Sequence, residues 1–548
     1  MTRRLALRLA LIAYGAVNAA TYASLLPLWE GFDEPFHYAY VQDLSAGRGF
    51  PVMLQSPLSG ETWESLKLAP GTESVKRGLN LPLTFDDYFL LSDARRAELR
   101  NRLARISKQT PPDGLNYEAQ QTPLAYVLLA PFDRLWQNAN LPTRVWRLRL
   151  VCGIFASVAT ALLLFRLTAR LGLPDEFQAA LVFLVLSTQM FYATTAHIAN
   201  DWLAVPVMLW LFDSLVALDA APGLKNALLV GIALAAGLLT KAYFLAMIPL
   251  AVGVVLLLSV RRRLEPRVAA LCLGIPVLLS SPWYIRNSLL YHSFTGMQQV
   301  RSGVTLRDVL RGALHLPWLQ SLQDLAYQSL WTGNNTFRTF SLHTLTLLLA
   351  GFVAAAALYV AASLRRTPSS AERLLLAGCL LYVLAIAYDT ALVYVSDHVL
   401  TAAPWYVQAI APVALSLLFC GLARSSFYGR AVVICLICLS AYIMTMTWWA
   451  KLIPLYAGYD GRSAPLQLIA WYRADFGRVL RVLGATAIAD PMLIMTLAAI
   501  ATISAIALAL LIAARTFPGK ATPPAEPAPV PEPNFPASQY RSTHPPTP

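Results

Sequence analysis

Residues 6–40 read ALRLALIAYGAVNAATYASLLPLWEGFDEPFHYAY, an apolar run that passes directly into an acidic motif. The apolar part, residues 6–28, is long enough to cross a bilayer as a helix. Asp33, Glu34 and His37 follow where that span would meet water. A carboxylate there is partly desolvated and therefore suited to proton transfer or cation binding. The stretch also fits a plain helix start in which Asp33 is the N-cap, and the two interpretations are compatible.

The rest of the chain is equally apolar. Of its 548 residues 57% are hydrophobic and 13% charged, which excludes a water-soluble globule. We expect an all-α polytopic membrane protein, a bundle of about twelve transmembrane helices with external juxtamembrane helices. The expected spans are 6–28, 145–168, 176–196, 201–218, 225–240, 242–260, 267–288, 341–363, 373–395, 402–423, 430–450 and 488–514. The six cysteines fall inside apolar runs, which predicts buried apolar side chains and not disulfides or metal ligands.

Basic residues at span ends predict the orientation. With the N-terminus in the cytoplasm, alternation of the spans puts the arginine-rich loops near residues 166–170, 261–263, 365–366 and 424–430 inside, as the positive-inside rule requires. The net charge of +13 follows this pattern and does not indicate nucleic-acid binding. The agreement requires residues 123–132, which are too few to cross, to lie along the outer membrane surface.

This orientation predicts the domain organisation. Residues 1–515 form one transmembrane domain, with external segments at 29–144, 291–340 and 451–487. Residues 516–548 contain eleven prolines and few large apolar residues, so we expect a disordered cytoplasmic tail. Both termini are then cytoplasmic. The protein is expected in a bacterial cytoplasmic (inner) membrane with an outward-facing site.

Polar residues collect at the outward ends of the predicted spans. They are Asp33, Glu34, His37, His197, Asn200, Asp201, Lys241, Arg286, Asn287, Asp389, Asp397 and His398. An ionisable group at a helix centre costs roughly 2.5–3.5 kcal/mol, so such groups persist where they pair or act. Lys241 either snorkels to lipid head groups or binds a phosphate, and Arg286 either anchors the interface beside Trp283 or does the same. Asp201 is either a helix N-cap or a functional acid.

The combination of cations and carboxylates suggests a chemistry. A lipid-linked donor would pair its phosphate with Lys241 and Arg286, and an acceptor hydroxyl would need a carboxylate base. The chain contains no Walker loop and no Gly-rich dinucleotide turn. These features favour transfer of a glycosyl group from a lipid phosphate on the outer face of the membrane.

On these residues the chain resembles the GT-C superfamily of integral-membrane glycosyltransferases, in the branch of protein O-mannosyltransferases and the lipid A aminoarabinose transferase. The motifs that carry the resemblance are Asp33-Glu34, Gln121-Thr122-Pro123-Leu124-Ala125-Tyr126, Asn200-Asp201, Gly237-Leu238-Leu239-Thr240-Lys241 and Pro282-Trp283-Tyr284-Ile285-Arg286-Asn287. They cover roughly residues 1–300. The chain departs from the family at Gln121 and Thr122, where a basic residue or His and then Pro are expected, and at Trp405, where the family has Arg.

The resemblance implies an inverting transfer from a polyprenyl-phosphate sugar to an acceptor hydroxyl. Its catalytic residues would be Asp33, as base, with Glu34 and Asp201, and its phosphate ligands Lys241 and Arg286. The implied substrate-binding residues are His37, Gln121, Tyr126, His197, Asn200, Tyr284 and Asn287. In some members a divalent cation (Mg or Mn) takes part, and its ligands here would be Asp33, Glu34 and Asp201. The partners are the lipid-linked sugar, membrane lipid and an acceptor glycan, lipid or protein, with no nucleic acid.

Other classes of protein share some of these features. A transporter or flippase also has many spans with isolated charges, but it predicts internal symmetry and broken helices near the midplane. A lipid-linked sugar ligase or polymerase predicts a large external loop late in the chain, whereas the largest loop here comes first. A non-catalytic scaffold is the third alternative.

Overall fold

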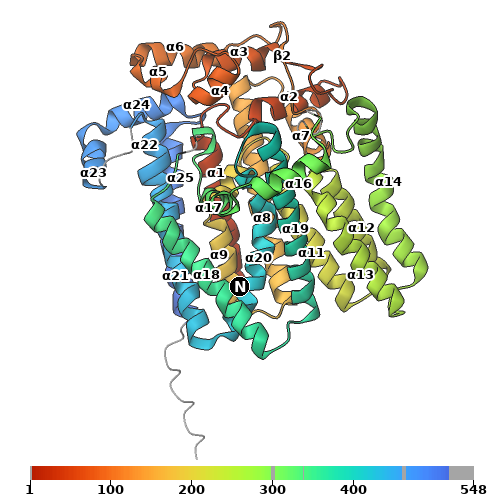
Figure 1. Cartoon of the computed structure of the whole chain (residues 1–548). Coiled ribbons are helices and arrows are strands. Elements are labelled where there is room, and N and C mark those ends of the chain that lie inside the picture. The colour runs from red at the N-terminus through yellow and green to blue at the C-terminus, as the bar shows by residue number, and fades with distance from the viewer. Residues whose placement is uncertain (1–2, 298–302, 337, 460–464, 517–548) are drawn as a thin grey trace, which may run out of the picture.

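The computed structural model describes residues 3–297, 303–336, 338–459 and 465–516, and the predicted tail lies outside these residues apart from Thr516 at the end of the last helix. The described chain is mainly helical with two short strands, which confirms the predicted fold class. It consists of a bundle of long apolar helices and a cap of short helices over one end of that bundle (Figure 1).

The bundle contains the long helices and a few short turns that continue them. They are α1 (Arg3–Leu25), α8 (Leu141–Arg170), α9 (Asp175–Leu186), α10 (Gln189–Thr195), α11 (Asp201–Ala220), α12 (Leu224–Leu238), η1 (Ala242–Met247), α13 (Ile248–Val260), α14 (Pro266–Tyr291), α18 (Leu342–Arg365), α19 (Ser370–Asp397), α20 (Pro404–Arg424), α21 (Ser426–Met446), η3 (Thr447–Leu452), α22 (Ile453–Tyr456) and α25 (Pro491–Thr516). Helix α1 packs against α8 and α25, and α11 packs against α8, α12 and α20.

The number of spans is smaller than predicted. Among the described residues, ten helices are long and apolar enough to cross a membrane, or eleven if a bent pair is counted as one span. That pair is α9 and α10, which meet at 60° and replace the straight span expected at 176–196. Helix α12, expected as the span 225–240, has only 15 residues. The apolar pattern identified the long helices of the bundle but could not show where a segment bends or stops short.

The cap is made from the segment between α1 and α8 and from two later segments. Its elements are α2 (Glu34–Ser45), β1 (Pro57–Leu58), α3 (Gly60–Leu68), α4 (Glu73–Gly78), α5 (Phe85–Leu90), α6 (Asp93–Ala104), β2 (Asp113–Leu115), α7 (Leu124–Leu135), α16 (Leu306–His315), α17 (Trp318–Leu330), η2 (Asn334–Thr336), α23 (Pro465–Ala474) and α24 (Phe476–Thr486). Figure 1 shows α2 to α6 and α24 gathered over the same end of the bundle. The apolar run at 123–132 forms α7, which at twelve residues is too short to span.

A two-stranded pairing folds the long cap segment back on itself. Strand β1 pairs antiparallel with β2, so that Pro57 lies opposite Leu115. The residue after β2, Asn116, continues this contact by donating its side-chain amide to the carbonyl of Phe36 at 3.0 Å. The chain segment that begins at Asn116 is therefore fixed beside the start of α2, although the two are 80 residues apart in sequence.

The cysteine expectation is wrong at two positions. All six cysteines are free thiols, as the composition indicated, and Cys152, Cys272 and Cys420 are buried. Cys435 and Cys438 are exposed on α21. The sequence could not show this, because an apolar run does not distinguish a side chain that faces the core from one that faces outward.

Candidate active site

Asp33 occupies a strained position at the start of α2. It is the N-cap residue with φ of 53°, in the left-handed region that non-glycine residues rarely adopt. Its side chain makes no capping hydrogen bond; instead its carboxylate accepts a hydrogen bond from the hydroxyl of Tyr117. The sequence left open whether Asp33 is a cap or a functional acid. The carboxylate has the cap position but is turned away from the capping role.

The tight turn before Asp33 depends on Gly31. A Cβ added at Gly31 would lie 2.7 Å from the Cβ of His197, so no larger side chain fits there without displacing the neighbouring loop. His197 is buried, and neither of its ring nitrogens has a hydrogen-bond partner among the described residues. Burial lowers its pKa, so the ring is neutral at pH 7. His197 therefore lies against the turn that carries Asp33 with unused hydrogen-bonding capacity.

A continuous chain of hydrogen bonds connects polar residues at the ends of the bundle helices next to the cap. The ammonium of Lys241 donates to Asp201 Oδ2 at 2.5 Å and to Asn200 Oδ1 at 2.9 Å. The amide of Asn200 donates to Gln121 Oε1 at 2.9 Å, and the amide of Gln121 donates to Glu118 Oε2 at 2.7 Å. The donor-only ammonium at one end and the acceptor carboxylate at the other fix the orientation of both amides.

The backbone supports this arrangement. The N–H of Leu124 at the start of α7 donates to the carbonyl of Leu239 at 2.9 Å, which holds the Gln121 segment next to the turn that carries Lys241. The sequence suggested that Lys241 could snorkel to lipid head groups. Its side chain is buried and paired with Asp201, and its ammonium lies 5.0 Å from the ring centre of Tyr406. Lys241 is thus held inside the protein as a fixed positive charge.

Three carboxylates share this single cation. Burial raises the pKa of Asp33, while the Tyr117 hydroxyl and Lys241 oppose that rise. Burial and the nearby charge of Asp33 raise the pKa of Glu118 to about 8. Asp201 already pairs with Lys241, so ionising all three carboxylates at once would cost free energy through their mutual repulsion. Asp33, with its hydrogen-bond donor, is better suited to the ionised form than Glu118.

Glu34 faces a different partner. Its carboxylate is fully buried and forms a two-pronged ion pair with Arg149 of α8, with N–O distances of 2.8 and 2.5 Å. It also accepts the backbone N–H of Ile198 at 3.1 Å. Burial acts to raise the pKa of Glu34, but Arg149 outweighs burial and holds that pKa below its usual value. The Glu34 carboxylate therefore ties α2 to α8 and to the loop before α11.

Glu30 performs a similar task for a later segment. It accepts the backbone N–H of Thr336 at 3.1 Å and lies 3.3 Å from the hydroxyl of Tyr456. Burial raises its pKa to about 8, so the carboxyl is predominantly protonated at pH 7. Next to it, the amide of Asn335 donates to the carbonyl of Gly31 at 3.1 Å. The loop containing η2 is thereby fixed against the turn that carries Asp33.

His37 and Tyr126 form a second pair within the cap. The Nδ1 atom of His37 lies 2.7 Å from the Tyr126 hydroxyl, and the Tyr126 ring stacks on Tyr40 with centroids 4.1 Å apart. Burial lowers the pKa of His37 well below its usual value, so the imidazole is neutral at pH 7. These contacts fasten α7 to α2.

The Arg286 segment lies next to this cluster, because the amide of Asn287 donates to the carbonyl of Gln120, the neighbour of Gln121, at 3.4 Å. Arg286 donates to the carbonyl of Pro51 at 2.7 Å and its guanidinium lies 4.6 Å from the ring centre of Trp283. Tyr284 donates to the carbonyl of Leu238, and Asn287 to that of Thr295. Arg286 Nη1 is buried and has no partner among the described residues. Arg286 is held by Pro51 and Trp283, and one of its N–H donors remains for a ligand.

The proposed cation ligands do not converge. Among the described residues, no group of three or more His, Cys, Asp or Glu side chains is arranged to hold a metal ion. Glu34 is engaged with Arg149 and Asp201 with Lys241, so two of the three expected ligands already neutralise a basic side chain. This donor set, as arranged, does not fit a divalent cation.

Sequence reasoning missed Tyr117 and Glu118. Both lie in Asn116-Tyr117-Glu118, directly after β2, at a place where no periodic pattern marks them. The available signal was an acidic residue three positions before Gln121 in a segment already identified by its Pro123-Leu124 pair. Their proximity to Asp33 depends on the β1–β2 pairing, which two- and three-residue strands do not reveal in the sequence.

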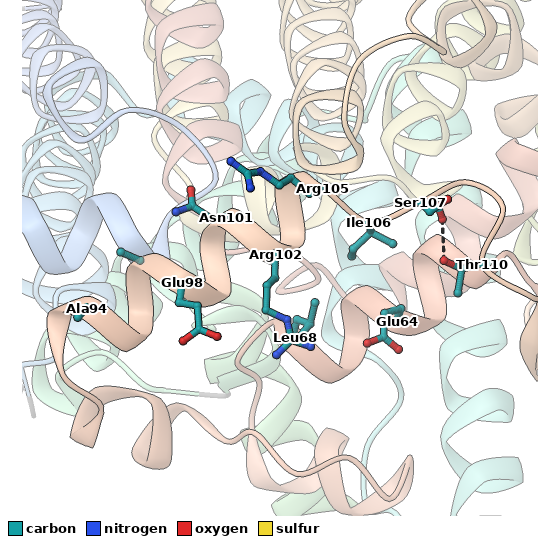
Figure 2. Close-up of a pocket in the computed structure, with 11 residues that line it drawn as sticks. Glu64, Leu68, Ala94, Glu98, Asn101, Arg102, Arg105, Ile106, Ser107 and Thr110 are labelled. Carbon is teal, nitrogen blue, oxygen red and sulfur yellow. Dashed lines mark hydrogen bonds between the residues drawn. The ribbon is translucent and has the colours of Figure 1, made fainter.

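A separate groove of 630 Å³ runs between α3 and α6 on the outside of the cap (Figure 2). Its lining includes Glu64, Glu98 and Arg102, and its far end is closed by a turn in which Thr110 donates to the carbonyl of Ser107 at 2.8 Å. None of its lining residues belongs to the hydrogen-bonded chain or contacts Asp33. The groove is therefore distinct from the candidate active site.

Comparison with known proteins gives matches only among solved structures. No protein-family model matches the chain, and no curated protein matches it. The chain is similar to ArnT from Cupriavidus metallidurans bound to undecaprenyl phosphate, at 14% identity and a TM-score of 0.45, over 93% of this chain and 77% of that one. It is also similar to the apo state of the same protein, at 17% identity and a TM-score of 0.38, over 78% and 72% of the two chains.

Both structures are of the same ArnT protein, once with undecaprenyl phosphate and once without a ligand. Because both TM-scores are below 0.5, the likeness is weak, and a functional assignment has to rest on the geometry around Asp33.

Proposed function

We propose that the protein is a membrane glycosyltransferase that moves a sugar from a polyprenyl-phosphate donor to an acceptor hydroxyl. The observation that carries the proposal is the position of Asp33: a half-buried carboxylate, unused as a cap, that accepts a hydrogen bond from Tyr117 and lies within electrostatic reach of Lys241. A base and a fixed cation in one buried site are what a transfer with a phosphate leaving group needs.

Asp33 is the general base in this proposal. Its carboxylate takes the proton of the acceptor hydroxyl as that oxygen attacks the anomeric carbon of the donor. The bond between the anomeric carbon and the phosphate oxygen breaks, and its electron pair stays on the phosphate. One displacement of this kind inverts the anomeric centre. The Tyr117 hydrogen bond favours the ionised form of Asp33 that the first step requires.

Lys241 is the proposed phosphate ligand. Its ammonium is held by Asp201 and Asn200 and does not have to be ordered when the donor arrives. Charge-assisted hydrogen bonds to phosphate are short and strong in such a buried site. Arg286, with its unpartnered Nη1, is the second proposed ligand, and it would act on the donor from the cap side.

The remaining predicted residues have supporting roles. Gln121 and Asn200 connect Lys241 to Glu118 through hydrogen bonds. His37 and Tyr126 hold α7 on α2. Glu34 positions the turn through Arg149 and does not touch the substrate in this scheme. We further propose that the cap faces outward from a bacterial cytoplasmic membrane and that both termini are cytoplasmic, since the basic loops lie at the other ends of the spans.

A transporter is the second candidate, because the break between α9 and α10 is a feature that transporters use. The base next to a fixed cation has no evident purpose in that function. The deciding experiment gives the purified full-length protein a panel of polyprenyl-phosphate sugars in vesicles. Release of free polyprenyl phosphate is the expected result; movement of intact donor across the bilayer without any release would contradict the proposal.

A further inference from the structure

A cavity of 280 Å³ lies against Asp33 in the cap. Its wall is built from the turn before α2, the end of α3, helix α4 and the loops that carry Tyr117 and Asn335. None of its lining residues belongs to a membrane-spanning helix. Lys241 and Asp201, by contrast, lie at the ends of spans and do not line the cavity. Asp33 therefore lines a cap cavity and also lies within electrostatic reach of the cluster at the end of the bundle.

Two oxygen acceptors belong to residues that line this cavity. One is the Asp33 carboxylate. The other belongs to Asn335, whose side-chain amide nitrogen donates to the carbonyls of Trp29 and Gly31 at 3.3 and 3.1 Å. That orientation leaves Asn335 Oδ1 as an acceptor, and no described residue donates to it. A ligand that satisfies both groups must carry hydroxyl or amine donors.

One buried donor completes the polar part of the lining. Lys76 is 3% exposed, and its ammonium donates to the carbonyls of Leu66 and Ala69 at 2.5 and 2.6 Å. A lysine ammonium has three N–H donors, so one remains for a ligand oxygen. No carboxylate pairs with Lys76 among the described residues, and burial lowers its pKa to about 8. The polar lining thus matches a molecule with several hydroxyl groups.

The apolar part of the lining and the volume narrow the ligand further. Phe36, Pro70, Val75 and Leu79 offer flat apolar surface, which fits the C–H face of a ring whose edge carries hydroxyls. Pockets for drug-sized ligands have volumes of about 300–1,000 Å³, so a cavity of 280 Å³ takes one ring and not a lipid anchor.

We propose that this cavity is the acceptor site and that the acceptor hydroxyl belongs to a sugar ring of a glycan outside the membrane. The proposal rests on the glycosyltransferase function proposed above and names its acceptor class. The acceptor oxygen reaches Asp33 from the cap while the lipid donor approaches from the bundle. Its proton passes to Asp33, its oxygen bonds to the anomeric carbon, and the phosphate leaves with the electron pair of the broken bond.

Binding can be tested without any donor. Gly78 lines the cavity, is exposed, and has no atom within 4 Å of an added Cβ, so Gly78→Cys should fold. In full-length protein lacking the native cysteines, methyl glycopyranosides at high millimolar concentration should slow labelling of this thiol by an impermeant maleimide severalfold. The matched control is Arg77→Cys, also exposed on α4 but outside the cavity lining, where labelling should not change.

Three labelling results would overturn the proposal: no protection at Gly78→Cys, equal protection at both positions, or protection only by a serine-containing peptide. The last result would assign the cavity to a polypeptide acceptor. This assay does not involve the donor, so its outcome is separate from the question of whether the protein releases polyprenyl phosphate.

A kinetic test follows from the same position. Gly78→Trp should raise the KM for a methyl glycoside acceptor at least tenfold and leave the donor KM and the hydrolysis of donor by water unchanged. Arg77→Trp, the same side chain one position away and outside the cavity lining, should behave as wild type. An unchanged acceptor KM in Gly78→Trp, or donor hydrolysis with no transfer to any glycoside, would contradict the acceptor assignment. Absence of polyprenyl phosphate release from every donor would instead contradict the proposed function itself.

Discussion

Tyr117 donates its hydroxyl hydrogen to the carboxylate of Asp33, although the two residues are 84 positions apart in sequence. The β1–β2 pairing makes this contact possible by returning the chain to the start of α2. The bond opposes the effect of burial, which raises the pKa of Asp33. Tyr117 is therefore a positioning residue whose hydrogen bond favours the ionised form of the proposed base.

Tyr117→Phe should move the acid limb of the pH–rate profile to higher pH. Loss of the hydroxyl removes a contribution that lowers the Asp33 pKa, so the ionised base is present only at higher pH. A hydrogen bond to a charged group is worth about 1.5–3 kcal/mol, which corresponds to a loss of tenfold or more at pH 7. Measurement of polyprenyl phosphate release from pH 5 to about pH 9 gives the profile. An unshifted limb would show that the bond does not control the base.

Asp33→Asn should reduce transfer by a hundredfold or more. The substitution keeps the shape of the side chain, and Asn tolerates the left-handed backbone at this position. General base catalysis contributes typically 10²–10⁴-fold, which sets the expected loss. Expression and melting temperature in detergent serve as controls for folding. Near-normal activity would move the base to Glu118 or Asp201.

Lys241→Met should weaken donor binding by roughly tenfold or more, because charge-assisted contacts are worth about 1.5–3 kcal/mol. The substitution also leaves Asp201 buried without its cation, which could by itself disturb the site. Lys241→Met combined with Asp201→Asn removes that imbalance, so a specific phosphate role predicts that the donor KM stays high in the double variant. Recovery of the donor KM would mean that the cation only neutralises Asp201.

Arg286→Met is the companion to this experiment. Arg286 contacts Pro51 and Trp283, which lie outside the Lys241 cluster. The effect of Arg286→Met on the donor KM should therefore be smaller than that of Lys241→Met. Unchanged donor affinity in both variants would mean that the phosphate binds elsewhere.

The ion pair between Glu34 and Arg149 should control stability. Both side chains are fully buried, and removal of one partner from a buried pair typically costs about 3–5 kcal/mol. We expect Glu34→Gln and Arg149→Met each to lower the melting temperature in detergent, and the double variant to recover part of the loss. The pKa of Glu34 is lowered in the folded state, so this stabilisation is present above the unfolded pKa and is lost as pH falls through the folded one.

The same variants also distinguish a structural role of Glu34 from the catalytic role proposed for Asp33. If Glu34→Gln leaves stability unchanged and abolishes transfer, the carboxylate acts in the chemistry and not as a tie between α2 and α8. The same melting assay on Asp33→Asn provides the comparison, because Asp33 has no ion pair of comparable burial among the described residues.

Much of the fold was predictable because lipid imposes a simple rule on the chain. Apolar runs of sufficient length form helices, and all twelve predicted segments are helical. The bend at Ser187 and Thr188 and the early end of α12 were not predictable, since an apolar run has the same composition whether it is straight or broken.

The site was predictable in its residues but not in its pairings. Lys241, Asp201 and Gln121 were identified by polarity in apolar surroundings, and the structure joins them through Asn200. The roles of Glu34 and Arg286 could not be read from the sequence because they depend on Arg149, hidden in the apolar pattern of α8, and on the path of the loop around Pro51. Polarity marks a residue as special, but only the fold decides its partner.

The orientation of the cap is the assumption on which the outward-facing site depends. Single cysteines in a background lacking the native ones test it. Arg105→Cys and Arg311→Cys, both exposed and on cap elements, should label with an impermeant thiol reagent in intact cells. Arg262→Cys and Arg366→Cys, exposed at the opposite ends of α13 and α18, should label only after permeabilisation. If Arg311→Cys labels only after permeabilisation, like Arg366→Cys and unlike Arg105→Cys, the segment before α18 lies on the cytoplasmic side of the membrane. Asn335 belongs to that segment and could then not reach the turn that carries Asp33, so the candidate active site could not form.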